Sequence, residues 1–383
     1  MRKRLFQAFS YPSTVWFPKT EHNFLIFICG AFLLAMFATP YPHIAMWVGF
    51  LFAAYAAIAN DSIQTIGTFI ASNQDKKWWV LWIFIGGIFC ATMFYSWITL
   101  NGDVSHGRLA AKGFEVAPTK FHFLQVAAPI FLLILTRLRM PVSTTFILLT
   151  SFAATTSAVG KVLAKSMSGY ILAFGLGLIF FLIVAKFSKK YFVGKAKPWW
   201  TVAQWITSGS LWAVWLTQDA ANIAVYLPRS LETSQFVAFI SIVTIGLGIL
   251  LYFKGGRIQK IVTEKSVVTD VRFATFIDLI YCVILFYFKL HSQVPMSTTW
   301  VFIGLLAGRE LGMSIMKTGS HTILSGMKLA LKDATFALIG LTVSIAIAVG
   351  VNENLSFSNV INEIPEAFAD GIIKFFKNLA GGG

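Results

Sequence analysis

The sequence predicts an all-α polytopic membrane protein made of two inverted five-element repeats, with broken or half helices that meet at the membrane midplane. Apolar runs of the length that spans a bilayer as a helix recur from residue 24 to residue 350. Charged residues make up only 12% of the 383 residues, about half the share found in soluble domains, and mean hydropathy is +0.72. A soluble protein of this size needs more surface charge. Two sequence motifs also occur twice, in the same order.

The apolar runs predict eleven membrane spans, and two of these runs are too long for one straight crossing. Residues 43–72 and 199–230 both carry polar residues near their middle, so each is predicted to be a broken helix. Lys161 and Lys165 are expected to extend toward the membrane surface. In chain order, the predicted spans are 23–39, 43–72, 78–99, 121–137, 142–163, 167–186, 199–230, 234–253, 272–290, 297–313 and 328–350.

Basic residues between the spans predict the orientation. Residues 186–198 contain five lysines, and residues 254–272 contain five Lys and Arg residues. Two spans separate these loops, so both lie on one side, and the positive-inside rule makes that side cytoplasmic. Tracing back places the N-terminus in the cytoplasm. The net charge of +15 therefore reflects orientation in the cell (inner) membrane, not nucleic-acid binding.

Five parts are predicted along the chain. Residues 1–42 form an N-terminal segment with an extra span, and residues 43–187 form the first repeat. A basic cytoplasmic loop at 188–198 leads to the second repeat at 199–350, and residues 351–383 form a C-terminal tail. An odd number of spans in each repeat makes the second repeat enter the membrane from the opposite side, which is common in secondary transporters.

A short polar segment is found once in each predicted repeat. Residues 141–145 read Pro-Val-Ser-Thr-Thr and residues 295–299 read Pro-Met-Ser-Thr-Thr, an offset of 154 residues. Serine and threonine favour N-caps, and proline discourages a helix from continuing through it. Each segment is predicted to begin a half helix whose N–H groups, hydroxyls and positive dipole end bind an anion without Arg or Lys. The alternative is Ser and Thr bonding back to their own helix. The predicted anion ligands here are Ser143, Thr144, Thr145, Ser297, Thr298 and Thr299.

An aspartate lies in each long span, ahead of the triplet. Asp61 precedes Ser143 by 82 residues, and Asp219 precedes Ser297 by 78. An ionised aspartate costs roughly 2.5–3.5 kcal/mol at a helix centre, so it needs a cation, a proton or water, unless it only caps a helix break. Nearby amides make a set of hard oxygen ligands suited to Na⁺. The predicted cation ligands are Asp61, Gln64, Asp219, Asn222 and Asp278, and the further predicted anion contacts are Asn60, Asp61, Gln218 and Asp219.

The two kinds of motif together predict that a cation and an anion bind side by side. Carboxylates alone would repel an anion. A cation bound between the carboxylates and the anion offsets that repulsion. No paired His/Asp metal spacing or activated nucleophile is found in the sequence, so no enzyme activity is expected. No cofactor is expected beyond the coupling ion, Na⁺ or H⁺. An ion channel or a membrane-embedded enzyme is the alternative from another class.

These motifs resemble those of the inorganic phosphate transporter (PiT) family. That family carries a Gly-Ala-Asn-Asp-Val-Ala-Asn type motif and a Pro-Val-Ser-Thr-Thr-His type motif in each half. The resemblance covers about residues 50–320, with Pro-Val-Ser-Thr-Thr at 141–145 as its most specific part. It implies a symporter in the lipid bilayer that moves inorganic phosphate with Na⁺ or H⁺. Some relatives carry sulfate, so sulfate or another oxyanion is the alternative substrate.

The chain departs from the family pattern around both motifs. Gln64 and Gln218 stand where the family has asparagine, and Phe146 and Trp300 stand where it has histidine. We therefore identify a divergent member of the family. The sequence leaves open which oxyanion is carried, the ion stoichiometry, and whether the first span is a scaffold or a contact in a homodimer.

Overall fold

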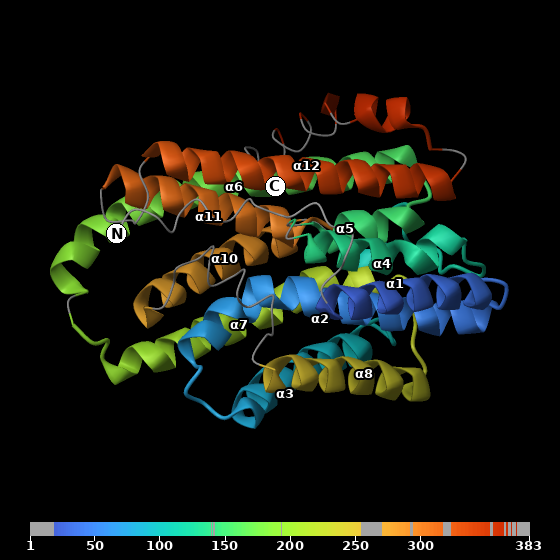
Figure 1. Cartoon of the computed structure of the whole chain (residues 1–383), viewed down its shortest axis with the longest axis horizontal. Helices are drawn as coiled ribbons and strands as arrows, with labels where there is room; N and C mark the ends of the chain where they lie inside the picture. Colours follow the sequence, from blue (N-terminus) through green and yellow to red (C-terminus); the bar gives the residue numbers. More distant parts are fainter. Residues whose placement is uncertain are drawn as a thin grey trace.

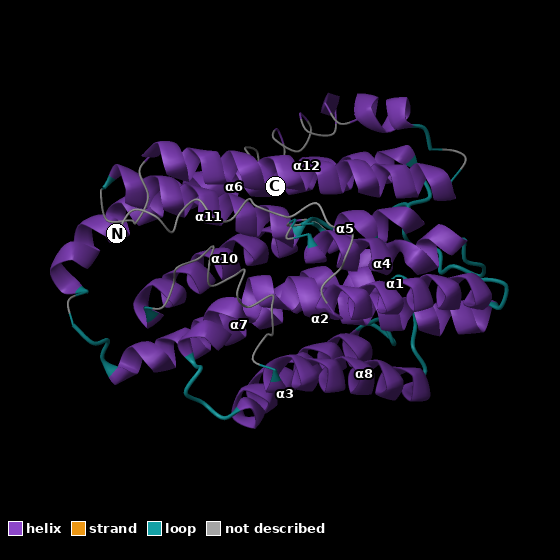
Figure 2. Ribbon diagram, in the orientation of Figure 1, coloured by secondary structure: helices purple, strands orange, loops and turns teal. Residues whose placement is uncertain are grey.

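The structure is a computed structural model that describes residues 19–138, 140, 142–192, 194–253, 270–291, 294–316, 323–352, 355–363, 365–366, 369 and 373. Helices make up all the regular secondary structure of these residues, as the sequence predicts (Figures 1 and 2). The α-helices are α1 Lys19–Ala38, α2 Pro42–Ser72, α3 Trp78–Thr99, α4 Phe123–Arg137, α5 Thr144–Ile147, α6 Thr156–Tyr191, α7 Pro198–Ala224, α8 Thr233–Tyr252, α10 Val271–His291, α11 Thr298–Ile315 and α12 Ile323–Val351, and the 3-10 helices are η2 Arg108–Ala110 and η3 Leu149–Phe152. The basic N-terminus, Pro141, residues 254–269 and most of the predicted tail lie outside the described residues.

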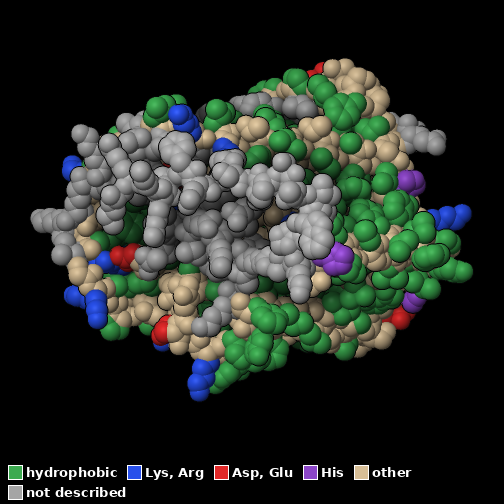
Figure 3. Space-filling model, in the orientation of Figure 1, with side chains coloured by type: hydrophobic (Ala, Val, Ile, Leu, Met, Phe, Trp, Pro, Cys, Tyr) green, Lys and Arg blue, Asp and Glu red, His purple; other side chains and the backbone are tan. Residues whose placement is uncertain are grey.

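Seven helices of the described chain are long and apolar enough to cross a membrane: α1, α2, α3, α6, α8, α10 and α12. Many of their large apolar side chains point outward, among them Phe37, Ile83 and Leu290. Apolar side chains cover much of the face drawn in Figure 3. In water such a surface would be unfavourable, whereas it suits contact with lipid. The chain is a multi-pass membrane protein.

Two predictions about the spans are wrong. Both long runs form unbroken helices, α2 and α7, and neither has a proline in its interior to break it. The predicted spans 142–163 and 167–186 are not separate, because α6 alone runs for 36 residues. Its central serines bond within the helix, with Ser166 Oγ donating to Val162 O at 2.6 Å and Ser168 Oγ donating to Ala164 O at 2.9 Å. The polar residues therefore require no turn.

Loops gather at two ends of the molecule, which we name the basic end and the opposite end. The basic end carries the 73–77 and 192–197 connections and the start of α10, which line a common pocket. The opposite end carries residues 100–122 and 225–232, joined by Leu231 N donating to Gly102 O at 2.9 Å. In Figure 1 these ends lie to the left and right.

Two hairpins enter from these two ends and meet inside. Helix α4 starts at the opposite end and turns back through α5, while α10 starts at the basic end and turns back through α11 (Figure 1). The hydroxyl of Thr145, on the first hairpin, lies 3.1 Å from the carbonyl of Met296, on the second. Opposite entry is the arrangement that an inverted repeat requires. The repeat boundaries themselves stay a prediction.

Helices α6 and α11 run side by side and in parallel, with their backbones in contact. A Cβ atom on Gly304 would collide with the carbonyl of Tyr170, and one on Gly308 would collide with that of Phe174. Small residues allow this close approach between membrane helices. The packing fixes the first turn of α11, which begins at Thr298.

Candidate functional site

The first buried carboxylate, Asp61, lies on α2 against the α4–α5 hairpin. The hydroxyl of Thr144 donates to its Oδ2, and Asn60 Nδ2 donates to its Oδ1 at 2.6 Å. Asn60 Nδ2 also donates to Val142 O at 3.0 Å, and Thr136 donates to Asn60 Oδ1 at 3.3 Å. The fold thus joins the first aspartate motif to the first triplet.

The second carboxylate, Asp219, has matching surroundings on α7. Thr298 donates its hydroxyl proton to Asp219 Oδ2, and Asn222 Nδ2 donates to Oδ1 at 2.8 Å. Trp215 Nε1 donates to the hydroxyl oxygen of Thr298 at 3.2 Å. In each half, therefore, the middle threonine of the triplet binds the aspartate of the same half.

Thr145 connects the two halves. Its hydroxyl lies 3.1 Å from Met296 O and 3.4 Å from Asp219 Oδ1, and it accepts from Asn222 Nδ2 at 3.2 Å. A hydroxyl has one proton, so Thr145 donates to one of the two acceptors at a time. All six triplet residues are buried, and the two motif pairs form one buried polar centre.

The serine of each triplet caps a helix, as predicted. Ser143 Oγ accepts from Phe146 N at 3.2 Å, and Ser297 Oγ accepts from Trp300 N at 3.2 Å. The two helices differ greatly in length, because α5 has four residues and α11 has eighteen. The half helix predicted at the first triplet is therefore only one turn long, and a single turn has a small dipole.

Two amide oxygens beside Asp219 accept no hydrogen bond within the described part of the chain. They are Gln218 Oε1 and Asn222 Oδ1, and both are buried. Their nitrogens are occupied, since Gln218 Nε2 donates to Leu285 O at 3.0 Å and Asn222 Nδ2 donates to Asp219. A buried acceptor left unsatisfied is unfavourable. Hard cations take carboxylate and amide oxygens as ligands, so these three residues fit Na⁺ by their chemistry.

Two predicted cation ligands lie apart from this centre. Asp278 accepts from Thr68 Oγ1 at 2.7 Å and from Ser208 Oγ at 2.5 Å. Thr68 follows Asp61 by seven residues on α2, which places it about 10 Å nearer the basic end at a rise of 1.5 Å per residue. Gln64 is half-buried, and among the described contacts no hydrogen bond joins its side chain to either central aspartate.

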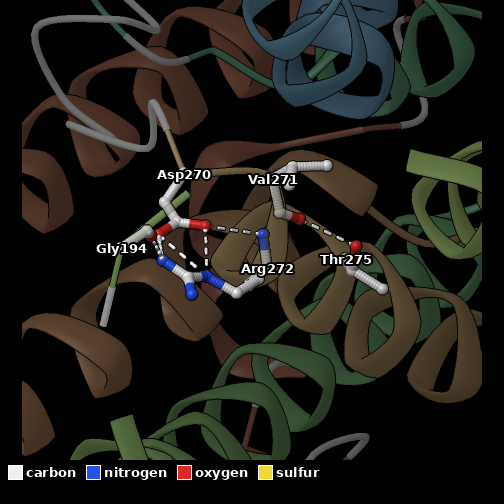
Figure 4. Close-up of polar contacts among 5 residues, drawn as sticks. All are labelled: Gly194, Asp270, Val271, Arg272 and Thr275. Carbon is white, nitrogen blue, oxygen red and sulfur yellow. Dashed lines mark hydrogen bonds and ion pairs between the residues drawn. The ribbon is translucent and has the colours of Figure 1, made fainter. Parts of the chain in front are cut away.

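An open pocket of about 520 Å³ lies at the basic end. Its wall includes Arg272, which pairs with Asp270 at 2.6 Å and donates to Gly194 O at 3.2 Å (Figure 4). The Arg272–Gly194 hydrogen bond joins the start of α10 to the 192–197 connection.

Polar side chains fill the layer between this pocket and Asp278. Gln204 on α7 donates to Ser72 Oγ at 2.5 Å and accepts from Asn73 Nδ2 at 3.0 Å. Gln204 and Asn73 are buried, while Ser72 and Asn73 also line the pocket. Polar groups thus lead from the pocket past Asp278 toward the central aspartates.

The sequence did not predict the basic side chains near the centre. Arg108, from the 100–122 segment, is buried, and its Nε donates to Thr217 O at 3.3 Å, two residues before Asp219. Burial lowers the pKa of Arg108 to about 10, and the charge of Asp219 opposes that shift. Lys165 is also buried and donates to Val294 O, so its expected place at the membrane surface is wrong. The sequence feature that could have indicated the burial of Arg108 is its position next to the apolar Leu-Ala-Ala at 109–111.

Among solved structures, the chain resembles a transporter. No protein-family model matches the chain, and no curated protein matches it. The solved structure described as "The sodium-dependent phosphate transporter" is similar with a TM-score of 0.48 and 15% identity, over 88% of this chain and 99% of that one. A likeness of this size carries no functional argument, so the assignment below depends on the site.

Proposed function

We propose that the chain is a secondary transporter that moves inorganic phosphate across the cell membrane together with Na⁺. Asp61 and Asp219 hold the coupling cations, and the two triplets bind the anion. The observation that supports this most is the pairing of each buried aspartate with the middle threonine of a triplet, at the meeting point of two hairpins. Charged residues inside a membrane protein are usually functional.

The surroundings of Asp219 favour a hard cation. Its carboxylate and the free oxygens of Gln218 and Asn222 provide three hard ligands from less than two turns of α7. Amide oxygens carry no net charge, so they bind Na⁺ without adding to the repulsion of a nearby anion. The cation then offsets the charge of Asp219, and an anion can approach.

The acceptors in the centre favour phosphate over sulfate. Phosphate keeps a proton at neutral pH and can donate it to a carboxylate, whereas sulfate has none to donate. Phe146 and Trp300 stand in place of the family's histidines, with their ring centroids 5.2 Å apart and the rings perpendicular. The buried Nε1 of Trp300 has no hydrogen-bond partner among the described residues. This difference from the family keeps sulfate or another oxyanion, driven by Na⁺ or H⁺, as the alternative.

Transport in this proposal exposes the centre first to one end and then to the other. With the N-terminus in the cytoplasm, the basic end faces inward, and its pocket is the release route. The α4–α5 and α10–α11 hairpins, which enter from opposite ends, are the elements expected to move. No bond in the substrate is made or broken.

Uptake into proteoliposomes tests this function. Radiolabelled phosphate uptake is measured under an imposed Na⁺ gradient, with sulfate as competitor, for the wild type, Asp61→Asn, Asp219→Asn and Glu366→Gln. We expect Na⁺-dependent uptake that sulfate leaves unchanged and that both central variants lose. Glu366 is exposed in the C-terminal segment, away from the centre and the basic-end pocket, so Glu366→Gln should retain uptake. Full coupled uptake by both central variants contradicts the mechanism. Strong inhibition by sulfate would favour the alternative, in which sulfate or another oxyanion is the substrate.

A further inference from the structure

Three basic side chains converge between the opposite end and the central site. Arg108 comes from the 100–122 segment, Lys165 from α6 and Lys289 from α10. Arg108 is 0% exposed and Lys165 is 8% exposed, while Lys289 is partly buried. Buried charges in a membrane protein are costly and usually functional. Because the three side chains come from three separate elements, their meeting in one place is poorly explained by chance.

Hydrogen bonds place this basic cluster beside the second half of the centre. Arg108 donates to Thr217 O, and Lys165 donates to Val294 O, three residues before Ser297. Lys289 Nζ donates to His106 O at 2.7 Å, which ties it to the same segment as Arg108. The cluster therefore adjoins both the approach to Asp219 and the start of α11.

The electrostatics of the cluster favour an anion. The charges of Arg108 and Lys289 both repel that of Lys165. Two acids offset this positive charge only in part: the charge of Asp103 acts on Lys289, and the charge of Asp219 acts on Arg108. An oxyanion between the cations would offset their mutual repulsion, because it interacts favourably with all three.

His106 adds a polar group without a partner. Its side chain is 7% exposed, and its Nε2 makes no hydrogen bond among the described residues. Burial, together with the charges of Lys289 and Arg108, lowers the pKa of His106 to about 3. The ring is therefore neutral at physiological pH, and one ring N–H can donate to an anion without adding charge.

We propose that Arg108, Lys165, Lys289 and His106 form a second binding site, for a tetrahedral oxyanion, on the path from the opposite end to the central site. That the anion is phosphate rests on the proposed function, while the cluster itself suits phosphate or sulfate. The site contains its own positive charge, so it binds the anion without Na⁺. It concentrates the anion beside Thr298 and Asp219, where binding then requires the cation.

Equilibrium binding in the absence of Na⁺ tests the site. Radiolabelled phosphate and, separately, sulfate are bound to the purified full-length protein in detergent, with choline replacing Na⁺. We expect binding to weaken about tenfold in Lys289→Gln, the loss expected for one charge-assisted hydrogen bond. Lys120→Gln removes the same charge from an exposed position in the same segment and should bind like the wild type. Asp219→Asn should also keep this binding, although it loses uptake.

Several outcomes overturn the proposal. The proposed site is refuted if the wild type binds neither anion in choline, or if Lys289→Gln binds the anion as tightly as the wild type does. Loss of the binding in Asp219→Asn places the anion in the central site instead. Size-exclusion chromatography checks folding, and Lys289→Arg should restore binding if charge is the cause. Binding that depends on Lys289, in a protein without Na⁺-driven uptake, supports this site and refutes the proposed function.

Discussion

Replacing Gly308 with alanine should push α11 away from α6. The new Cβ would collide with Phe174 O and lie 2.7 Å from Leu178 N, both backbone atoms of α6. Ordinary contact begins near 3.4 Å, so the Leu178 contact alone requires the helices to separate by about 0.7 Å, and the closer Phe174 contact requires more. Neither atom can rotate away, because both belong to the helix backbone.

The expected cost follows from two opposing effects. Overpacking costs about 2–3 kcal/mol at a site that cannot adapt, and alanine is favoured over glycine in a helix by about 1 kcal/mol. We expect the free energy of unfolding to fall by about 1–2 kcal/mol. Gly175→Ala on α6 is the matched control, because its Cβ would meet nothing within 4 Å and should stabilise the helix.

Denaturant unfolding in detergent, followed by tryptophan fluorescence, measures both variants. The two substitutions should change stability in opposite directions. Equal stability of Gly308→Ala and Gly175→Ala would refute the backbone contact between α6 and α11. Because α11 begins at Thr298, Gly308→Ala should also reduce Na⁺-driven uptake.

Three further predictions concern the polar layers. Thr298→Val removes the hydroxyl that links Trp215 to Asp219, so uptake should fall about tenfold or more. Thr298→Ser keeps a hydroxyl and should retain most of the uptake. Equal uptake by the two variants would contradict this role of the hydroxyl. The pKa of His106 is about 3 against an ordinary 6.5, so the unfolded chain gains a proton first as pH falls and stability should decrease from about pH 6.5 downward. The drop in unfolding temperature between pH 7 and pH 5 should be smaller for His106→Gln than for the wild type. Equal drops would show that His106 does not cause the loss of stability. Gln204→Leu removes the acceptor of the buried Asn73 Nδ2 and should lower the free energy of unfolding by about 1–3 kcal/mol in the same denaturant assay. An unchanged value would show that the layer is solvated.

The apolar runs made the helical class predictable, and the paired motifs made the centre predictable. Asp61 and Asp219 recur at matching distances from the triplets, and the fold brings each aspartate to its own triplet. Ser143 and Ser297 cap helices because capping depends on local sequence, which can be read directly. Repetition thus gave long-range information that a single motif lacks.

Helix continuity and the basic cluster were not predictable in the same way. A run of 31 residues exceeds a bilayer crossing, yet α2 stays whole because side-chain contacts satisfy Asp61 without breaking the backbone. Arg108 carried no prediction, and Lys165 was expected at the membrane surface. Their burial depends on tertiary packing between segments far apart in sequence, which no local pattern records.

If the chain is the transporter proposed above, the position of Thr145 has a consequence for leakage of ions. Its single proton is shared between Met296 O on one hairpin and Asp219 on α7, so separating these elements in an empty carrier breaks a buried hydrogen bond with nothing to replace it. A loaded carrier has bound ions that can provide substitute contacts. The empty protein should therefore change conformation more slowly than the loaded one if no water enters. The higher barrier to conformational change in the empty protein limits how much of an ion gradient is dissipated without moving substrate.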